Sequence, residues 1–358
     1  MISVIVVNYH SAHQTERAIK SVLEDGGERE IIVVDNTCAP DEREILDEFR
    51  REYGIVLIMN ERNVGFGRAC NQAFARSSGE YIFLLNPDAF VVSPCLGILE
   101  EFLDSKSSAG SVSPQVFWDD ERQYLFPCYS VYAPFEALCF QLSVLSDTFR
   151  SFYSLFQRRK NLALWTLSKP VAVENLHGGV AMVRRSAAEK AGGLFDERFF
   201  LFFEDTDLFF RLRKTGYGLY ILPEAKAVHN HVHSPKKLDT ITQMSRLYYE
   251  KHYRRSILLK ISESLPGGLP ERSCYDLGAW STPPLFHVQD TLAGGKYLFE
   301  WSPNPVFVPS IGSFGSGGEF ELSRQIWDLL DNGRYFSRFT PCSGSVLSYT
   351  TCCWEKAI

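Results

Sequence analysis

The stretch Glu80-Tyr-Ile-Phe-Leu-Leu-Asn-Pro-Asp88 decides how the rest of the chain is interpreted. Its apolar residues run without interruption from Tyr81 to Leu85, which is typical of a strand buried on both faces of a parallel sheet. Pro87 has no amide hydrogen for the ladder, so the strand is expected to end there. Asp88 then lies at the carboxyl end of a central strand, where open α/β sheets bind ligands. Asn-Pro-Asp is also good turn chemistry, and the tripeptide alone favours a turn.

Composition excludes several classes of protein. The chain has 358 residues, of which 45% are hydrophobic and 22% charged, as expected for a soluble globular protein of two or three domains. A net charge of −6 argues against nucleic acid as the main partner. A strand beginning at Ile2 and the lack of long apolar runs predict neither a signal peptide nor a transmembrane helix. Nine scattered cysteines without Cys-x-x-Cys spacing predict reduced thiols in a cytoplasmic protein.

Apolar and amphipathic segments alternate over the first 85 residues. The predicted strands and helices alternate in the order Ile2–Tyr9, Ser11–Glu24, Glu30–Asn36, Asp41–Tyr53, Ile55–Met59, Asn63–Ser77 and Tyr81–Leu85. Short loops between alternating elements predict an α/β fold with a Rossmann-like, mostly parallel, doubly wound sheet.

Polar side chains stand where these strands end. They are Asn8, Asp35, Asn36, Asn86 and Asp88, and the strand ends of such a sheet line one crevice. Asp35 could accept from a ribose hydroxyl or a base N–H, or serve as an ordinary loop or cap residue. Neither the Gly-x-Gly-x-x-Gly fingerprint nor a P-loop motif is present in the sequence, which argues against a nicotinamide or flavin dehydrogenase and a P-loop kinase.

A second group of candidate residues lies between positions 177 and 233. The double glycine Gly178-Gly179 allows backbone to approach a ligand, or merely forms a tight turn. An aromatic run then leads into Glu204, Asp205 and Asp207. Acids at a helix start suit its dipole, whereas a carboxylate desolvated by neighbouring phenylalanines suits a general base. Three alternating histidines, His229, His231 and His233, would share one face of a strand and could bind metal.

Two further regions carry open alternatives. The aromatic stretch Tyr124–Leu167 is interpreted either as an amphipathic helix pair that meets a membrane or lipid-linked acceptor, or as helices packed on the core, and the core is favoured. A helix is expected over Ile241–Ile261, then a linker at 263–284 and a small all-β, sandwich-like module at 285–358. The module faintly resembles fibronectin type III domains, and the predicted main domain is 1–262.

In their order and separations, the motifs resemble the family 2 inverting glycosyltransferases with the GT-A fold, in the rhamnosyltransferase and galactofuranosyltransferase-like branch. The resemblance covers residues 2–234. It rests on Val33-Val-Asp-Asn36, Asn63-Val-Gly-Phe-Gly67 with Asn71, Leu84-Leu-Asn-Pro-Asp88, Gly178-Gly179 with Val183-Arg-Arg185, Gly193-Leu-Phe-Asp-Glu197, Phe203-Glu-Asp-Thr-Asp207 and His229.

This resemblance implies a nucleotide-diphosphate sugar donor, a divalent cation (Mn²⁺ or Mg²⁺) and inversion at the anomeric carbon. Asp205 would be the base that deprotonates the acceptor hydroxyl, with Glu204 the close alternative. Asp88 would be the metal-ligating acid of the Asp-x-Asp motif, and His229 would complete the metal site. Asn86 replaces the first acid of that motif, so a single carboxylate should hold the metal weakly. The residues expected at the nucleotide sugar are Asn8, Asp35, Asn36, Asn63, Gly67, Asn71, Asn86, Gly178 and Gly179.

The predicted function is therefore transfer of a sugar, with rhamnose the first candidate, to a glycan or lipid-linked glycan in bacterial surface polysaccharide biosynthesis. The predicted location is the cytoplasm, at the inner face of the plasma membrane if the aromatic stretch meets lipid. One alternative is a non-catalytic protein that binds a glycan or nucleotide sugar on a transferase fold. Another is a nucleotidyltransferase, which would need a glycine-rich basic loop where Asn8-Tyr9-His10 stands.

Overall fold

The structure is a computed structural model, and it describes residues 1–230, 238–266, 274–289, 292, 294–342 and 351–357. The chain divides into two compact units, each with its own apolar core. The described residues of the first unit are 1–116, 167–230 and 238–252, and those of the second are 117–166 and 253 onwards. Among the helices in the described parts of the chain, none is both long and apolar enough to cross a membrane.

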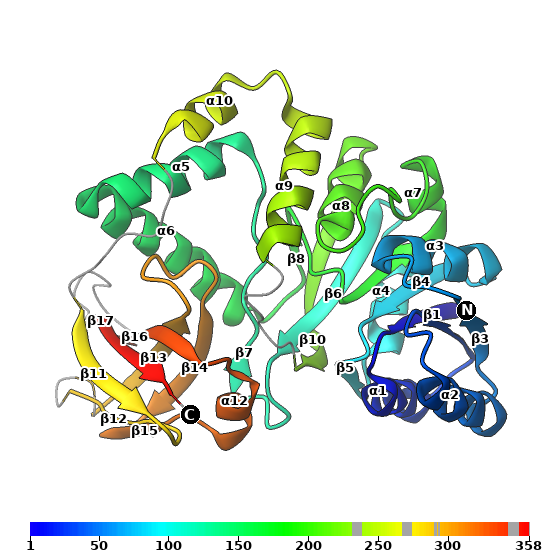
Figure 1. Cartoon of the computed structure of the whole chain (residues 1–358), viewed down its shortest axis with the longest axis horizontal. Coiled ribbons are helices and arrows are strands. Elements are labelled where there is room, and N and C mark those ends of the chain that lie inside the picture. The colour runs from blue at the N-terminus through cyan, green and yellow to red at the C-terminus, as the bar shows by residue number, and fades with distance from the viewer. Residues whose placement is uncertain (231–237, 267–273, 290–291, 293, 343–350, 358) are drawn as a thin grey trace. The chain divides into compact units, whose positions relative to one another are not determined.

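The first unit begins with the predicted alternation of strands and helices (Figure 1). Parallel strands pair in the order β4-β1-β2-β3, and Asn8 at the end of β1 lies opposite Asp35 at the end of β2. Helices α1 and α2 cover one face of these strands and α3 the other. The elements are β1 Ile2–Asn8, α1 Ala12–Asp25, β2 Arg29–Asp35, α2 Pro40–Tyr53, β3 Val56–Met59, α3 Phe66–Arg76 and β4 Tyr81–Leu85.

Antiparallel strands complete the sheet of the first unit. Strand β9 pairs antiparallel with β4 on one side and β6 on the other, and β10 pairs antiparallel with β5 and β8. The sheet is therefore mixed, and the expectation of a mostly parallel sheet holds only for its first half. The added elements are β5 Ala89–Val92, α4 Leu96–Ser105, β6 Ala109–Phe117, β8 Val171–Val173, β9 Val180–Arg184, α7 Arg185–Lys190, α8 Glu204–Lys214, β10 Gly218–His229 and α9 Leu238–Tyr253.

The second unit combines helices with a strand region around an aromatic core that includes Phe299, Trp327 and Trp354. Its strands follow the order β11-β17-β16-β13-β14-β7, and β12 pairs with β15 separately. The elements are β7 Tyr124–Leu125, α5 Pro134–Leu145, α6 Asp147–Trp165, α10 Ile257–Ser264, β11 Tyr275–Trp280, β12 Leu285–His287, β13 Lys296–Ser302, β14 Ile311–Ser316, β15 Glu319–Glu321, α12 Arg324–Leu329, β16 Gly333–Pro341 and β17 Thr351–Lys356.

The observed units differ from the predicted linear segments. The predicted helix over 241–261 is two helices, α9 and α10, which fall in different units. Strand β11 lies inside the segment predicted as a linker, whose residues 267–273 are outside the described residues. The last short strand that the sequence predicts within the module, at 345–352, also lies mostly outside the described residues. A strand overlaps each of the other segments of the module that the sequence predicts as short strands, 285–288, 296–301, 319–322 and 334–339, while their grouping as a separate sandwich module stays a prediction.

A disulfide joins Cys274 to Cys353 within the second unit, with their Cα atoms 5.8 Å apart. Cys353 belongs to β17 and Cys274 immediately precedes β11, so the bond fastens two paired strands. The prediction of reduced thiols throughout is wrong for this pair. The two residues are 79 positions apart, and their spacing therefore carries no local signal.

Replacing Cys274 with Ser is expected to lower the free energy of unfolding of the second unit by about 2–4 kcal/mol, because the cross-link restricts the unfolded chain over a long loop. All six tryptophans belong to this unit, so their fluorescence during a urea titration in non-reducing buffer reports on it alone. Cys342→Ser, which removes an exposed free thiol of the same unit, is the matched control. Equal urea midpoints for Cys274→Ser and the wild type would contradict the prediction.

Candidate active site

The ends of β1 and β2 are joined by a buried polar network centred on Asn8. The Asn8 Nδ2 group lies 3.2 Å from Asp35 Oδ1 and 2.9 Å from a Glu42 carboxylate oxygen, and donates to both. Its Oδ1 accepts hydrogen bonds from the hydroxyls of Ser11 and Thr15. Because Asn8 is fully buried and engaged on both sides of its amide, its side chain fixes the loops that follow the two strands.

Asp35 and Asn36 are also buried, and they connect β2 to the loop that precedes α3. Asp35 Oδ2 lies 3.4 Å from Arg43 Nε, which brings a cation to this end of the sheet. Asn36 donates to the Gly65 carbonyl at 3.2 Å and accepts from Asn60 at 2.8 Å. Arg43 was missed by the sequence analysis, although its place in the first turns of α2, next to the end of β2, is a signal that could have identified it.

Residues of the Asn63-to-Asn71 motif hold a second loop against α3. Asn63 Oδ1 accepts from the Gly65 N–H, and Gly65 has a φ of +89° that favours glycine. The Asn71 side chain makes two hydrogen bonds with the backbone of Phe195, at 2.9 and 3.0 Å. A Cβ on Gly67 would lie 3.2 Å from the Phe199 carbonyl oxygen. These contacts bring the 195–203 loop onto the start of α3.

Asn86, Asp88 and His229 meet at the ends of β4 and β10. His229 Nε2 lies 3.1 Å from Asp88 Oδ1 and 3.3 Å from Asn86 Nδ2. The Asn86 N–H donates to the Gly179 carbonyl at 2.8 Å. A Cβ on Gly179 would lie 2.8 Å from Asn86 Nδ2 and 2.9 Å from His229 Cε1, so only glycine fits beside this cluster. The structure therefore brings together the two predicted metal ligands and Asn86, which precedes Asp88 by two residues.

Asp88 and His229 suit a divalent cation that takes its remaining ligands from a bound molecule rather than from the protein. Among the described residues there is no cluster of three or more His, Cys, Asp and Glu side chains arranged to hold a metal. Asp88, which is 22% exposed, and His229 supply one carboxylate and one imidazole nitrogen side by side. The other two alternating histidines, His231 and His233, lie outside the described residues.

Asp205 reaches the same cluster through the double glycine. Its Oδ2 accepts a hydrogen bond from the Gly178 N–H at 2.9 Å, and its Oδ1 accepts from the Thr206 N–H at 2.6 Å. A Cβ on Gly178 would lie only 2.3 Å from Asp205 Cβ, so the loop can approach α8 this closely only as glycine. Gly178 and Gly179 thus connect a partly exposed carboxylate to the group formed by Asn86, Asp88 and His229.

Glu204 points into a different environment. Its side chain is buried, near Gly67 of α3, and burial raises its pKa well above the ordinary value, with the neighbouring Asp205 charge adding to the shift. Within the described part of the chain, its Oε2 atom has no hydrogen-bond partner. Burial of this kind favours the neutral form of the carboxyl, and a buried side chain is poorly placed to collect a proton from a solvent-facing group.

The backbone before Asp205 is strained and firmly held. Phe202 and Phe203 both have left-handed conformations, with φ of +72° and +67°, which bulky residues rarely adopt. Two residues later Asp207 is fully buried, with Oδ2 at 2.7 Å from Arg211 Nε and Oδ1 at 2.7 Å from His252 Nε2. Non-glycine residues in such conformations cluster at functional sites, where the surrounding contacts maintain them.

The Asp207 carboxylate also accepts a hydrogen bond from Lys251, which pairs with Asp196 as well. Burial acts to raise the Asp207 pKa, but the hydrogen bonds from His252 and Lys251 and the charge of Arg211 hold it below the ordinary value. Lys251 and His252 of α9 were not among the predicted site residues. They lie in the helix that the sequence predicts over Ile241–Ile261, to which no role at the site was assigned.

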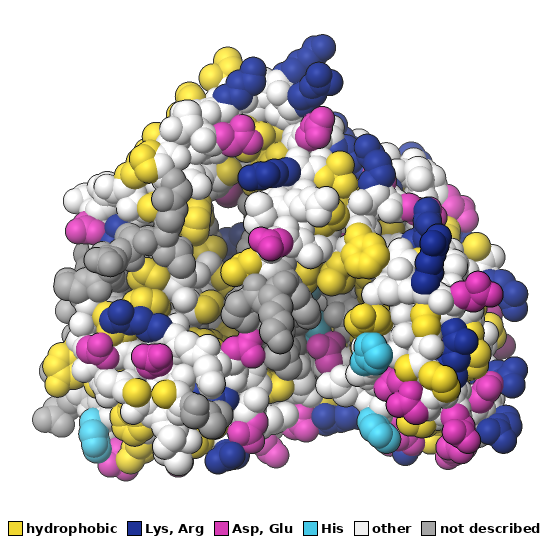
Figure 2. Space-filling view, in the orientation of Figure 1, with side chains coloured by type: hydrophobic (Ala, Val, Ile, Leu, Met, Phe, Trp, Pro, Cys, Tyr) yellow, Lys and Arg dark blue, Asp and Glu magenta, His cyan; other side chains and the backbone are white. Residues whose placement is uncertain are grey.

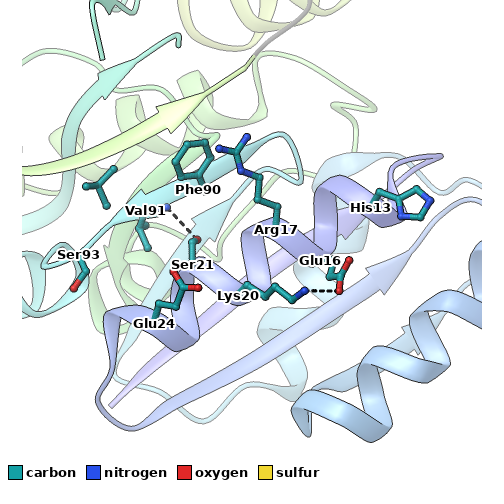
Figure 3. Close-up of a pocket in the computed structure, with 10 residues that line it drawn as sticks. His13, Glu16, Arg17, Lys20, Ser21, Glu24, Phe90, Val91 and Ser93 are labelled. Atoms are coloured by element: carbon teal, nitrogen blue, oxygen red, sulfur yellow. Dashed lines mark hydrogen bonds and ion pairs between the residues drawn. The ribbon is translucent and has the colours of Figure 1, made fainter. Parts of the chain in front are cut away.

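A separate surface groove of about 550 Å³ lies between α1 and β5 (Figure 3). The guanidinium of Arg17 stacks 3.8 Å above the Phe90 ring, and Lys20 pairs with Glu16 at 2.8 Å. Acidic and basic side chains both line the groove, and Asp88 and Asp205 do not, so it is distinct from the candidate active site.

Comparison with known proteins finds the family that the motifs of the sequence resemble. The family model described as Glycosyl transferase family 2 matches residues 3–192. N-acetylglucosaminyl-diphospho-decaprenol L-rhamnosyltransferase of Mycobacterium tuberculosis is 28% identical over 209 residues, 52% of this chain and 62% of that protein. The chain thus spans about three fifths of that relative's length. Rhamnosyltransferase WbbL of Escherichia coli K12 is 26% identical, over 64% of this chain and 83% of that protein.

One of the solved structures that match this chain in a structural comparison is a mannosyltransferase from Pyrobaculum calidifontis in complex with GDP-Man and Mn²⁺. It has 16% sequence identity and a TM-score of 0.45, and the alignment covers 74% of this chain and 73% of that one.

Proposed function

Since the chain belongs to glycosyl transferase family 2, we propose that it is an enzyme that transfers a sugar from a nucleotide-diphosphate sugar to a hydroxyl group of a glycan or lipid-linked glycan. The two relatives named as rhamnosyltransferases make rhamnose the first sugar to test. The observation that carries the proposal is the close grouping of Asp88, His229 and Asp205 around Gly178-Gly179. It combines candidate metal ligands with a carboxylate base in one place.

In this proposal Asp205 is the base and Glu204 is not. Inverting transfer needs one group that removes the proton of the acceptor hydroxyl as the new glycosidic bond forms, and no covalent nucleophile. Asp205 is partly exposed and oriented by the Gly178 and Thr206 amides, whereas Glu204 is buried beside α3. The proton passes from the acceptor oxygen to an Asp205 oxygen, while the nucleoside diphosphate leaves from the opposite face of the sugar.

Asp88 and His229 would hold the divalent cation, Mn²⁺ or Mg²⁺. When bound, the cation supplies positive charge that stabilises the departing diphosphate. The nucleoside is assigned to the end of the sheet where Asp35, Asn36 and Arg43 lie, and Asn8 fixes the loops that follow β1 and β2 there. The 195–203 loop, with Phe199 and Phe203 buried and Phe200 45% exposed, is proposed to exclude water from one side of the site.

Asp88→Ala is expected to weaken metal-dependent donor binding by at least about tenfold. The change removes a direct metal ligand, and loss of a residue that only supports a ligand already lowers metal affinity by about tenfold or more. Binding of a panel of UDP-, dTDP- and GDP-sugars is measured by calorimetry with Mn²⁺, with Mg²⁺ and with a chelator. Asp47→Ala on the outer face of α2 removes a carboxylate far from the strand ends and is the control.

If the wild type bound none of the nucleotide sugars in the panel, the transferase proposal would be wrong. Metal-dependent binding without turnover on any acceptor would favour the non-catalytic binding protein, for which Asn86 in place of an acid is the supporting observation. Equal affinities of wild type and Asp88→Ala in the presence of metal would remove Asp88 from the cation site.

A further inference from the structure

Exposed apolar side chains are concentrated on three helices of the second unit. Phe152 and Phe156 of α6 are 67% and 58% exposed, and Ile257 of α10 is 73% exposed. Helix α5 packs against both α6 and α10, so the three helices form one layer. The other exposed large hydrophobic residues of this layer are Phe135, Leu145, Leu258 and Ile261. Exposed apolar side chains gathered on one group of packed helices indicate an interaction site.

The two longer helices of the layer differ in how their apolar residues are used. One side of α6 faces the protein and buries Tyr153, Arg158 and Trp165, while Phe152 and Phe156 lie on the exposed side. Helix α5 is apolar nearly all round, yet only Pro134 and Ser143 are buried in it. A helix with apolar residues on every side normally lies in a core or in contact with lipid. In this structure α5 has protein on part of its surface only.

Basic side chains accompany this apolar surface. Arg159 of α6, Arg254 and Arg255 before α10, and Lys260 within α10 are all exposed. Two acids of these helices are also exposed, Asp147, which is paired with Arg150, and Glu263 near the end of α10; the chain as a whole has a net charge of −6. Figure 2 shows hydrophobic side chains along the outer edge of α10 and α5 with Lys and Arg side chains beside them. Apolar residues flanked by cations complement a bilayer that contains anionic lipids.

We propose that α5, α6 and α10 form a docking surface for an anionic lipid bilayer. The exposed phenylalanines and isoleucines enter the boundary between headgroups and acyl chains, and the arginines and Lys260 contact the anionic headgroups. The prediction that the aromatic residues of Tyr124–Leu167 pack in a core is correct for Tyr124, Tyr153 and Trp165, which are buried. It is wrong for Phe152 and Phe156, which are exposed. The surface lies wholly within the second unit, and its lipid binding does not depend on the transferase chemistry.

The test is flotation of the full chain with vesicles of phosphatidylcholine alone or mixed with phosphatidylglycerol, in the absence of nucleotide sugar. The wild type is expected to float with the mixed vesicles. The triple variant Phe152→Ser, Phe156→Ser, Ile257→Ser is expected to partition about tenfold less. The matched control, Tyr275→Ser, Leu285→Ser, Phe314→Ser, changes three other exposed hydrophobic residues of the same unit and should stay within about twofold of wild type.

A second variant keeps the apolar residues and removes charge. Arg254→Gln with Arg255→Gln is expected to reduce binding to mixed vesicles only, and salt should produce the same loss in the wild type. Wild-type protein that stays at the bottom of the gradient would overturn the proposal, and so would equal losses in the triple variant and its control. Light scattering tests the alternative that a second copy of the chain covers this surface. If the wild type and the control were dimers and only the triple variant were a monomer, the surface would be assigned to a second copy instead.

Discussion

Asp205→Asn is expected to lower kcat by about 10²–10⁴-fold and to leave the affinity for the donor within about twofold of wild type. The substitution keeps the size of the side chain and one oxygen for the Gly178 N–H, but an amide cannot take the proton of the acceptor hydroxyl. The measurement is steady-state transfer with the donor identified by the binding panel, together with calorimetric donor affinity. Unchanged turnover would show that another group removes the proton.

Glu204→Gln is the matched control for this experiment, because it makes the same chemical change at the adjacent position. Burial raises the pKa of Glu204 well above its ordinary value, which favours the neutral carboxyl, and Gln matches the shape and charge of that neutral form. Turnover is therefore expected to stay within about threefold of wild type. If Glu204→Gln lost activity and Asp205→Asn kept it, the roles assigned to the two carboxyls would have to be exchanged.

The sequence predicted the first half of the fold well because the information there is local. Strands such as Tyr81–Leu85 are short, continuous and apolar, and a proline or polar residue ends them. The apolar pattern of a strand does not determine whether the strand runs parallel or antiparallel to its neighbour. Strand β9 has the same apolar pattern as its neighbour β4, yet it runs antiparallel to it because of the connection that precedes it. The mixed character of the sheet was therefore beyond a local interpretation.

In the candidate site, too, residues in local motifs were identified from the sequence, and residues that depend on distant contacts were not. Asn86, Asp88, Gly178, Gly179, Asp205 and His229 were all identified from sequence, and the structure groups them. The resemblance placed Asp205 first as the base and Glu204 as the close alternative. The difference between their surroundings is visible only in three dimensions, because adjacent residues at a helix start point about 100° apart and meet different neighbours. Lys251 and His252 were missed because their partner Asp207 is over 40 positions away along the chain.

Glu300→Gln is expected to lower the free energy of unfolding of the second unit by about 3–5 kcal/mol, the largest effect on stability that we predict. Glu300 is fully buried and accepts two hydrogen bonds from Arg338, at 2.8 and 2.9 Å, while Arg158 Nε lies 2.8 Å from the same carboxylate. Both arginines are only 1% exposed. Gln cannot balance either charge, so two guanidinium groups would remain buried without a counter-ion in this network.

The measurement is a urea titration followed by tryptophan fluorescence, which reports on the second unit alone. Asp328→Asn breaks an exposed ion pair with Arg324 in the same unit and is expected to change stability by less than about 0.5 kcal/mol. The triple variant Glu300→Leu, Arg158→Met, Arg338→Met separates two explanations. If the cost of Glu300→Gln comes from unbalanced buried charge, removing all three charges should restore most of the lost stability, because a well-packed apolar replacement of a buried ion group is often neutral. If the triple variant is as unstable as Glu300→Gln, the network stabilises through its specific hydrogen bonds to Ser154 and Thr340, which join α6 to β16.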